Sequence, residues 1–289
     1  MVEIEYVAPE SIDEAVKLFA GSAKKARLMA GGTDLIIQLK NKISEPHLVI
    51  DLKKITDLKK TELTDDELII GPAQCCAEFT ARDDIKAVFP GLVEAAFLIG
   101  STQVQGRASV GGNLCNASPA ADSIPALIVT GAQCVISGQD GTREVAVEDF
   151  VTGVGTHCLR KGEILTSIRI KRPQKGTADA YLRMIPRTEM DIAVAGAGVS
   201  LTIDKSGQCT AARVAIGAVA PTAILVPAAA TALIGSKLEE TALEAAADAA
   251  RKAASPITDR RGTKEYRTHV VGVLVKRAAK IAAERAKGN

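Results

Sequence analysis

Two glycine-rich segments constrain the fold of this 289-residue chain more than any other feature. They are AGGTDL, at residues 30–35, and ASVGGNLCNASPAAD, at residues 108–122. Glycine has no Cβ, and the neighbouring residues are small or carry hydroxyl or amide groups, so either backbone can closely approach a ligand. The first segment leads from an apolar run into a helical pattern, and a helix N-terminus favours phosphate. Together the segments suggest a pyrophosphate clamp; the alternative is a tight turn at each glycine pair.

The common nucleotide-binding motifs are missing from the chain. Gly153-Val154-Gly155 and Gly196-Ala197-Gly198 each supply two glycines of the G-x-G-x-x-G pattern, but the third glycine is absent. The chain also lacks the G-x-x-x-x-G-K-[ST] loop. A dinucleotide-binding Rossmann fold and a P-loop fold are therefore excluded, and the phosphate cradle must belong to another fold.

The first part of the chain alternates between strand and helix patterns, which indicates a mixed α/β fold. Short apolar or alternating runs predict strands, and apolar residues at helical spacing predict helices; Thr33 or Asp34 could cap the second helix. We expect strands at 3–7, 27–30, 47–52 and 133–137, a hairpin from 59–63 and 67–70, and helices at 12–19, from 35 and at 91–99; the run 124–130 is apolar.

After Lys171-Arg172-Pro173 the pattern changes to a block of strands followed by a block of alanine-rich helices. Such a block indicates a separate α+β domain, with a boundary near residues 173–177. We expect antiparallel strands at 178–184, 192–203 and 211–219, then helices at 227–234, 239–254 and 268–285.

Composition narrows the classes of ligand and partner. With 36 Lys and Arg against 34 Asp and Glu, the formal net charge is +2, which argues against nucleic acid or an anionic membrane as the main partner. Aromatic residues make up only 3% of the chain and Trp is absent, so a large ligand is expected to be held by backbone amides and small residues. The uncharged stretch 214–236 is long enough to cross a bilayer, but Pro221 and Pro227 interrupt it, so no membrane span is expected.

No set of side chains predicts hydrolytic or metal chemistry. None of the six cysteines forms a C-x-x-C pair, so we expect no metal site and free, mostly buried thiols in a reducing cytoplasm, as the absence of a signal peptide also suggests. His47, His157 and His269 are scattered and are interpreted as surface or packing residues. The basic residues of the C-terminal stretch predict a solvated helix face or a dock for an acidic partner; they are Arg260, Arg261, Lys264, Arg267, Lys276, Arg277 and Lys280.

AGGTDL and SVGGNLCNASPAAD resemble the paired FAD-binding signatures of the flavoprotein (medium) subunit of molybdenum hydroxylases, the family of carbon monoxide dehydrogenase and xanthine dehydrogenase. The resemblance covers nearly the whole chain, through GEILTSIRI (162–170), YLRMIPRTEMDIAVAG (181–196), GAVAPT (217–222) and DRRGTKEYR (259–267). It implies an FAD-binding domain of the vanillyl-alcohol-oxidase type at 1–175, in two parts of about 1–55 and 56–175. A small α+β C-terminal domain with a three-stranded antiparallel sheet would follow at 176–289.

The resemblance also implies cofactor-binding residues. Ile99 would lie near the flavin, Asp122 would accept hydrogen bonds from the cofactor, and Leu165 and Arg183 would lie against its adenine or isoalloxazine portion. The two halves of the pyrophosphate clamp would be Leu28, Met29, Ala30, Gly31, Gly32, Thr33, Asp34 and Leu35, and Ser109, Val110, Gly111, Gly112 and Asn113.

The chain departs from the family pattern in three places, one of them a pair of residues. The carbon monoxide dehydrogenase branch tends to carry His-Ser where this chain has Thr33-Asp34, and often a Tyr where this chain has Asp191; relatives often have Lys in place of Arg183. The first two departures leave the substrate of the complex open. Clustered cysteines, which would accompany a 4Fe–4S insertion, are absent from the sequence.

By this resemblance the chain would be an oxidoreductase subunit that needs no catalytic side chain of its own. A large partner subunit would hold the molybdenum cofactor and a small one the 2Fe–2S centres, in a cytoplasmic dimer of heterotrimers. The FAD would pass electrons from the 2Fe–2S centres to an external acceptor. Two alternatives remain: a self-contained flavin-dependent reductase or oxidase of the same fold, and a non-catalytic assembly subunit without FAD.

Overall fold

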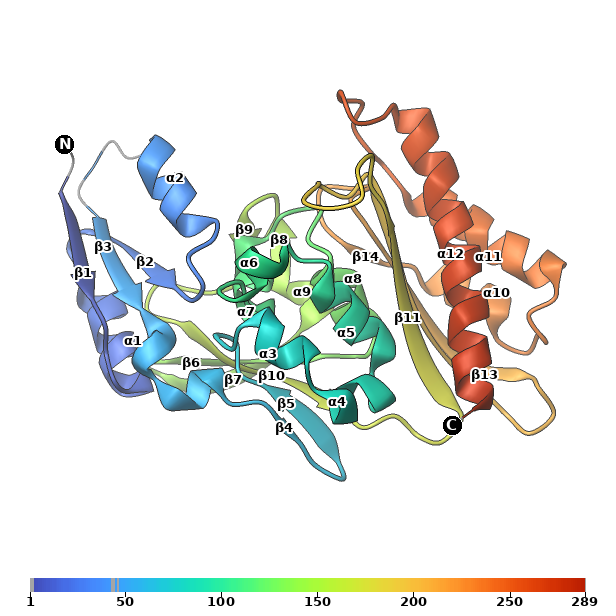
Figure 1. Cartoon of the computed structure of the whole chain (residues 1–289), viewed down its shortest axis with the longest axis horizontal. Coiled ribbons are helices and arrows are strands. Elements are labelled where there is room, and N and C mark those ends of the chain that lie inside the picture. The colour runs from blue at the N-terminus through green and yellow to red at the C-terminus, as the bar shows by residue number, and fades with distance from the viewer. Residues whose placement is uncertain (1–2, 43–44, 46, 289) are drawn as a thin grey trace.

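The N-terminal region of the computed structural model, which describes residues 3–42, 45 and 47–288, is a small parallel sheet (Figure 1). Its strand order is β1-β3-β2, and β3 is buried along its whole length because it is central. The helix α1 begins where the Ser11 hydroxyl accepts a hydrogen bond from the Glu14 amide. The elements are β1 (Ile4–Val7), α1 (Ile12–Gly21), β2 (Lys25–Met29), α2 (Leu35–Lys42) and β3 (His47–Asp51), followed by the 3₁₀ turns η1 (Leu52–Lys54) and η2 (Thr56–Lys59).

A five-stranded antiparallel sheet of order β4-β5-β10-β6-β7 forms the next layer. Its strands are β4 (Glu62–Leu63), β5 (Glu67–Ile70), β6 (Gln133–Gly138), β7 (Gly141–Ala146) and β10 (Ile164–Lys171), with the ribbon β8 (Val151–Gly153) and β9 (Thr156–His157) beside it. The predicted hairpin at 59–70 is the β4-β5 pair. Short helices cover one face of the sheet: α3 (Cys76–Thr80), α4 (Asp83–Val88), α5 (Pro90–Phe97), α6 (Thr102–Gln105), α7 (Val110–Asn116), α8 (Ser123–Val129) and α9 (Val147–Phe150).

A four-stranded antiparallel sheet lies on the other side of these helices (Figure 1). The three long strands match the prediction, and a two-residue fourth strand joins them at the edge. The elements are β11 (Thr177–Met184), β12 (Ala195–Ile203), β13 (Cys209–Gly217) and β14 (Ile224–Leu225), then α10 (Pro227–Leu233), α11 (Glu240–Ala253) and α12 (Lys264–Lys287). Buried alanines on α12, such as Ala278 and Ala282, let this helix lie close to the sheet.

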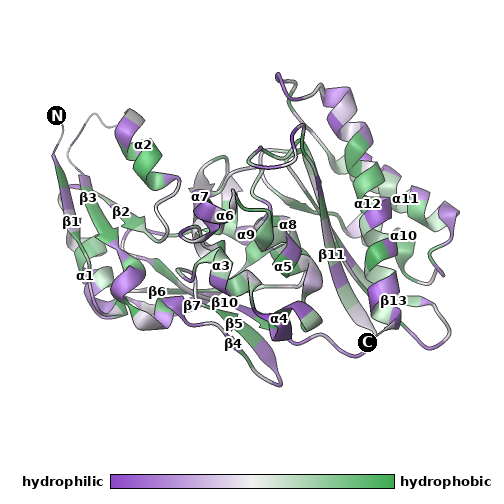
Figure 2. Ribbon diagram, viewed as in Figure 1, coloured by the Kyte–Doolittle hydropathy of each residue, from purple (hydrophilic) through white to green (hydrophobic). Residues whose placement is uncertain are grey.

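The central layer of helices is apolar because it is covered from both sides. In Figure 2, α8 between the two large sheets is mostly green, whereas purple residues gather at the tip of the β4-β5 hairpin and at the end of α12. The uncharged stretch 214–236 folds as the end of β13, then β14 and α10; the first strand and the helix were predicted, and β14 was not. No helix in the described ranges has the length and apolar content that crossing a bilayer requires.

One buried carboxylate joins the central helices to the C-terminal sheet. Asp179 on β11 accepts hydrogen bonds from the backbone N–H groups of Gly91 (3.0 Å) and Leu92 (2.8 Å), at the N-terminus of α5. A Cβ on Gly91 would lie 2.7 Å from the backbone of Ala180, so only glycine fits there. Arg285 at the end of α12 donates to the Asp179 carbonyl (2.9 Å) and pairs with a carboxylate on α5.

The basic C-terminal stretch is a solvated face only in part, because Arg260, Lys264, Arg277 and Lys280 are exposed and the other three basic residues are not. Arg267 is buried, and its guanidinium donates to the Val194 carbonyl (2.8 Å) and to Asp259 (2.7 Å). Lys276 pairs with Glu240 and Glu244 on α11. Much of this charge is therefore neutralised within the C-terminal part, because α12 packs on α11 and on the sheet.

We predict that Asp179→Asn lowers the free energy of unfolding by about 1–3 kcal/mol near pH 4, because both oxygens of Asp179 can accept a hydrogen bond and the amide nitrogen of Asn cannot. Burial raises the pKa of Asp179 from its ordinary 3.8 to about 6. The folded state therefore binds the proton more tightly, so the contribution of Asp179 is full below about pH 4 and declines as the pH rises through about 6.

Urea denaturation of both proteins between these pH values measures the difference. The difference in the free energy of unfolding between wild type and Asp179→Asn should narrow as the pH rises. The exposed Asp65→Asn control should stay close to wild type throughout. A gap that is constant or that widens with pH would contradict the account.

Candidate functional site

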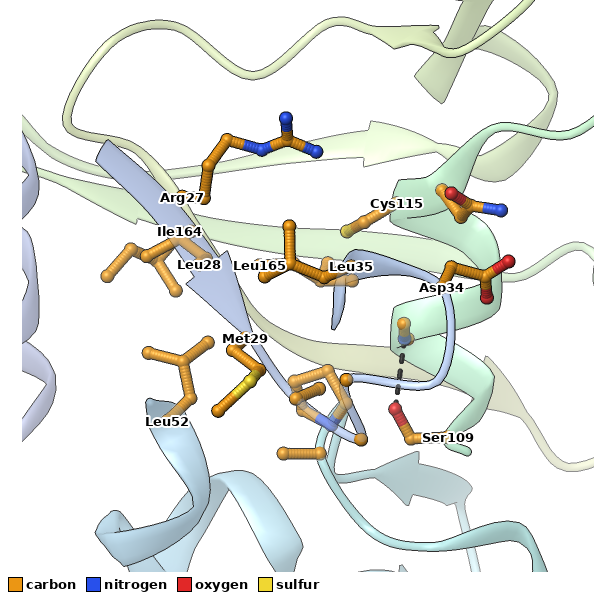
Figure 3. A pocket seen from close by; sticks show the side chains of 18 of the residues that line it. Arg27, Leu28, Met29, Asp34, Leu35, Leu52, Ser109, Cys115, Ile164 and Leu165 are labelled. Carbon is orange, nitrogen blue, oxygen red and sulfur yellow. Dashed lines mark hydrogen bonds between the residues drawn. The ribbon is translucent and has the colours of Figure 1, made fainter. Parts of the chain in front are cut away.

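A cavity of about 540 Å³ lies where β2, the first glycine segment and α7 meet (Figure 3). This volume is in the range of small-molecule and cofactor sites. Its walls come from the β2 strand and the loop at its carboxyl end, from α2, from α7, and from residues 157–165 leading into β10. Fourteen of the predicted cofactor residues line it: Leu28, Met29, Ala30, Gly31, Gly32, Thr33, Asp34, Leu35, Ile99, Ser109, Gly111, Gly112, Asn113 and Leu165.

The glycines of the first segment let it touch the second segment. A Cβ added to Gly31 would lie 1.9 Å from the carbonyl oxygen of Arg107 and 3.0 Å from the Cα of Ala108, so the two backbones are in direct contact where the second segment begins. Gly32 has a φ of +78°, a left-handed conformation that side chains disfavour. The sequence pattern suggests that these glycines allow the approach of a ligand. For Gly31, the structure shows a contact between two protein segments instead.

The second segment forms the N-terminal turn of α7. The Ser109 hydroxyl accepts a hydrogen bond from the Gly112 amide at 3.0 Å, drawn as a dashed line in Figure 3. A Cβ on Gly111 would lie 2.3 Å from Pro72, so this glycine is also required for packing. Gly112 differs, because a Cβ there would meet only the Ser109 hydroxyl (2.9 Å) and the methyl group of Ala30 (3.7 Å), both of which line the cavity.

Several backbone amides at this junction have no protein partner. In the ranges that the structure describes, the N–H groups of residues 31–35, Val110 and Gly111 donate no hydrogen bond to protein. The predicted cap by Thr33 or Asp34 is not formed among these residues, so α2 starts at Leu35 with free amides. Such amides at loop and helix N-termini bind phosphate oxygens. The site therefore fits the pyrophosphate of a dinucleotide.

A hydrogen-bonded row of polar side chains forms part of the cavity wall, which sequence analysis missed. Arg27 donates to the side-chain oxygen Oε1 of Gln38 at 2.7 Å, and the side-chain nitrogen Nε2 of Gln38 donates to Oδ1 of Asn116 at 3.0 Å. The row joins β2, α2 and α7. The available signals were spacing alone: Arg27 precedes Met29 by two residues on β2, and Gln38 follows Asp34 by one helical turn.

Three predicted residues do not line the cavity. Val110 is buried inside α7. Asp122 accepts hydrogen bonds from Tyr181 (2.9 Å) and Arg183 (2.6 Å), and burial raises its pKa to about 6 against the opposing effect of Arg183. Arg183 also donates to the Leu98 carbonyl (3.0 Å). Both oxygens of Asp122 thus have protein partners, and this buried network supports the backbone beside Ile99.

The other residues that sequence analysis singled out lie as follows. Asp191 pairs with Arg187 (3.3 Å) and Arg261 (3.5 Å), away from the cavity lining. His157 does line the cavity, and its ring centre lies 5.7 Å from that of Phe150. Burial lowers the pKa of His157, so it is neutral near pH 7.

His47 is buried and His269 is exposed. All six cysteines are free thiols, of which Cys76, Cys134 and Cys209 are buried and the others half-buried.

Comparison with known proteins places this site in a family. A profile described as FAD binding domain in molybdopterin dehydrogenase matches residues 2–173, and one described as CO dehydrogenase flavoprotein C-terminal domain matches residues 180–282. The carbon monoxide dehydrogenase medium chain of Afipia carboxidovorans is 34% identical over 98% of each chain. The E. coli O157:H7 xanthine dehydrogenase FAD-binding subunit is 28% identical over 98% of this chain and 97% of its own.

A solved structure agrees over nearly the full length. Carbon monoxide dehydrogenase from Hydrogenophaga pseudoflava contains a chain that superimposes with a TM-score of 0.93 at 33% identity, over 98% of both chains. The predicted resemblance is confirmed. The chain belongs to the family of FAD-binding medium subunits of molybdenum hydroxylases.

Proposed function

We propose that the cavity holds FAD with its pyrophosphate between the two glycine-rich segments and its flavin toward Ile99. The observation that carries this assignment is that unpartnered amides from residues 31–35 and from Gly111 belong to residues that line one cavity. Apolar side chains such as Leu165 cover the cavity walls next to them. The family matches at 2–173 and 180–282 support assigning residues 1–175 to FAD binding and 176–289 to a second domain.

The chain's own residues bind and orient the cofactor. When bound, FAD supplies the redox chemistry, accepting electrons and delivering them onward. The amides of the two segments fix the phosphates, and Leu28, Leu35 and Ile164 exclude water from the cavity. The Asp122, Tyr181 and Arg183 network holds the backbone of Leu98, and thereby positions Ile99. No nucleophile or acid–base pair is needed for this task.

The proposed partners follow from the relatives. Their names describe medium chains and FAD subunits of dehydrogenases, so we assign this chain to a complex with a large molybdenum-cofactor subunit and a small 2Fe–2S subunit. A cytoplasmic dimer of heterotrimers, in which FAD takes electrons from the 2Fe–2S centres, is the proposed arrangement. Gly112 is intact although a Cβ there would meet only residues that line the cavity, which argues against an assembly subunit that has lost FAD.

We predict that the purified chain, alone or with its partner subunits, binds one FAD and is yellow. Absorbance near 450 nm, with the flavin identified after heat release, measures this. The reconstituted complex should reduce the flavin when its hydroxylase substrate is added, whereas the isolated chain should not turn over. Turnover by the isolated chain would favour the stand-alone reductase. A colourless protein that cannot be reconstituted with FAD in either form would contradict the proposal.

We also predict different outcomes for the two neighbouring glycines. Gly112→Val should weaken FAD binding about 100-fold while the protein stays folded. The added side chain would overpack the part of the cavity where the cofactor binds, which costs about 1–3 kcal/mol of binding free energy. Gly111→Val should lower the free energy of unfolding, because its side chain meets the Pro72 backbone. Fluorescence titration and thermal unfolding measure the two effects.

Gly21→Val is the matched control, because a Cβ there meets nothing within 4 Å. It should bind FAD as wild type does. If Gly112→Val keeps wild-type affinity for FAD, α7 is not part of the clamp.

A further inference from the structure

The backbone amides of the proposed clamp do not by themselves neutralise the negative charge of a bound pyrophosphate. A pyrophosphate carries two negative charges in FAD, and backbone amides supply only partial positive charge. Asp34, at the start of α2, is exposed at the cavity and adds a negative side chain. A side chain of fixed positive charge in the cavity wall would balance the cofactor.

Five basic residues line the cavity, and four of them are unsuited to this task. Lys24 pairs with Glu3 (3.1 Å) and Glu5 (3.0 Å), and Lys25 pairs with Glu45 (3.1 Å). Lys161 is exposed and reaches the Ser22 carbonyl at 3.5 Å. Arg160 is exposed, and no described group holds its guanidinium in place. The fifth residue is Arg27.

Arg27 is half-buried and is held by one hydrogen bond. Its Nη2 donates to Gln38, which is fixed in turn by Asn116 on α7. Within the described residues, Nε and Nη1 of Arg27 have no protein partner. Figure 3 shows Arg27 and Ser109 on opposite sides of the cavity, so a group between them would face the guanidinium on one side and the amide clamp on the other. His157, neutral near pH 7, brings no competing charge.

We propose that Arg27 is the counter-ion of the cofactor's pyrophosphate, held in place by Gln38 and Asn116. This inference rests on the proposed function. The planar guanidinium can offer its free N–H groups to phosphate oxygens, and its orientation is fixed before the cofactor arrives. Gln38 and Asn116 are positioning residues, because they reach the cofactor only through Arg27. The glycine segments would then set the shape of the site, and Arg27 its charge.

The test compares ADP with adenosine, which share a nucleoside and differ by the diphosphate. Calorimetry on the full chain gives both dissociation constants, and fluorescence titration gives that of FAD. Arg27→Gln should weaken ADP and FAD roughly 10- to 100-fold and leave adenosine within about threefold of wild type. Arg27→Lys should recover part of the loss, because it keeps the charge without the planar fork.

Two further variants sharpen the test. Gln38→Leu keeps the Arg27 charge but removes its support, so ADP should weaken about fivefold with adenosine unchanged. This variant also tests the proposal if Arg27→Gln fails to fold. Lys17→Gln removes an exposed cation outside the cavity lining and should change neither constant.

The outcomes separate the two proposals. Equal losses for ADP and adenosine would mean that Arg27 contacts the nucleoside, and would overturn the inference. Unchanged ADP and FAD binding in Arg27→Gln would overturn it while FAD binding by wild type upholds the proposed function. Wild-type protein that binds neither FAD nor ADP would overturn both.

Discussion

The site depends on one contact, in which the backbone at Gly31 touches the carbonyl of Arg107. A Cβ at Gly31 would come within 1.9 Å of that oxygen, so no other amino acid permits this approach. The contact brings together two segments that belong to different layers, one at the end of a parallel strand and the other before α7. Their free amides then face the same cavity. Gly111 against Pro72 fixes the second segment in the same way.

Hydrogen bonds from the C-terminal part of the chain support the elements around this junction. Asp179 links the start of α5 to β11, and Arg285 ties α12 to the same place. The Asp122, Tyr181 and Arg183 network connects the C-terminal sheet to the backbone beside Ile99. The C-terminal part therefore supports the cavity without lining it, because Ile99 and the other lining residues come from the first part of the chain. Low aromatic content is compatible with such a site, because backbone amides and small apolar residues form it.

Sequence analysis predicted those features that depend on local pattern. The predicted strands, the alanine-rich helices and the two glycine segments have short-range signals and occur close to where they were expected, whereas β7 and the central strand β10 were not predicted. The roles of Arg267 and Arg27 could not be predicted. Each is one basic residue among several, and only packing decides that Arg267 is buried beneath Val194 while Arg27 faces a cavity. Likewise, nothing local distinguishes Gly111, which packs on Pro72, from Gly112, which faces the cavity.

Hydrogen–deuterium exchange of the amides tests the central claim most directly. Those of residues 31–35, Val110 and Gly111 have no protein partner, so they should exchange rapidly in the cofactor-free chain. Adding FAD should slow exchange in peptides covering residues 30–36 and 109–113 more than in the exposed β6-β7 turn. Exchange that is unchanged in both segments, at FAD concentrations where the protein is saturated, would contradict the assignment of the pyrophosphate to this junction.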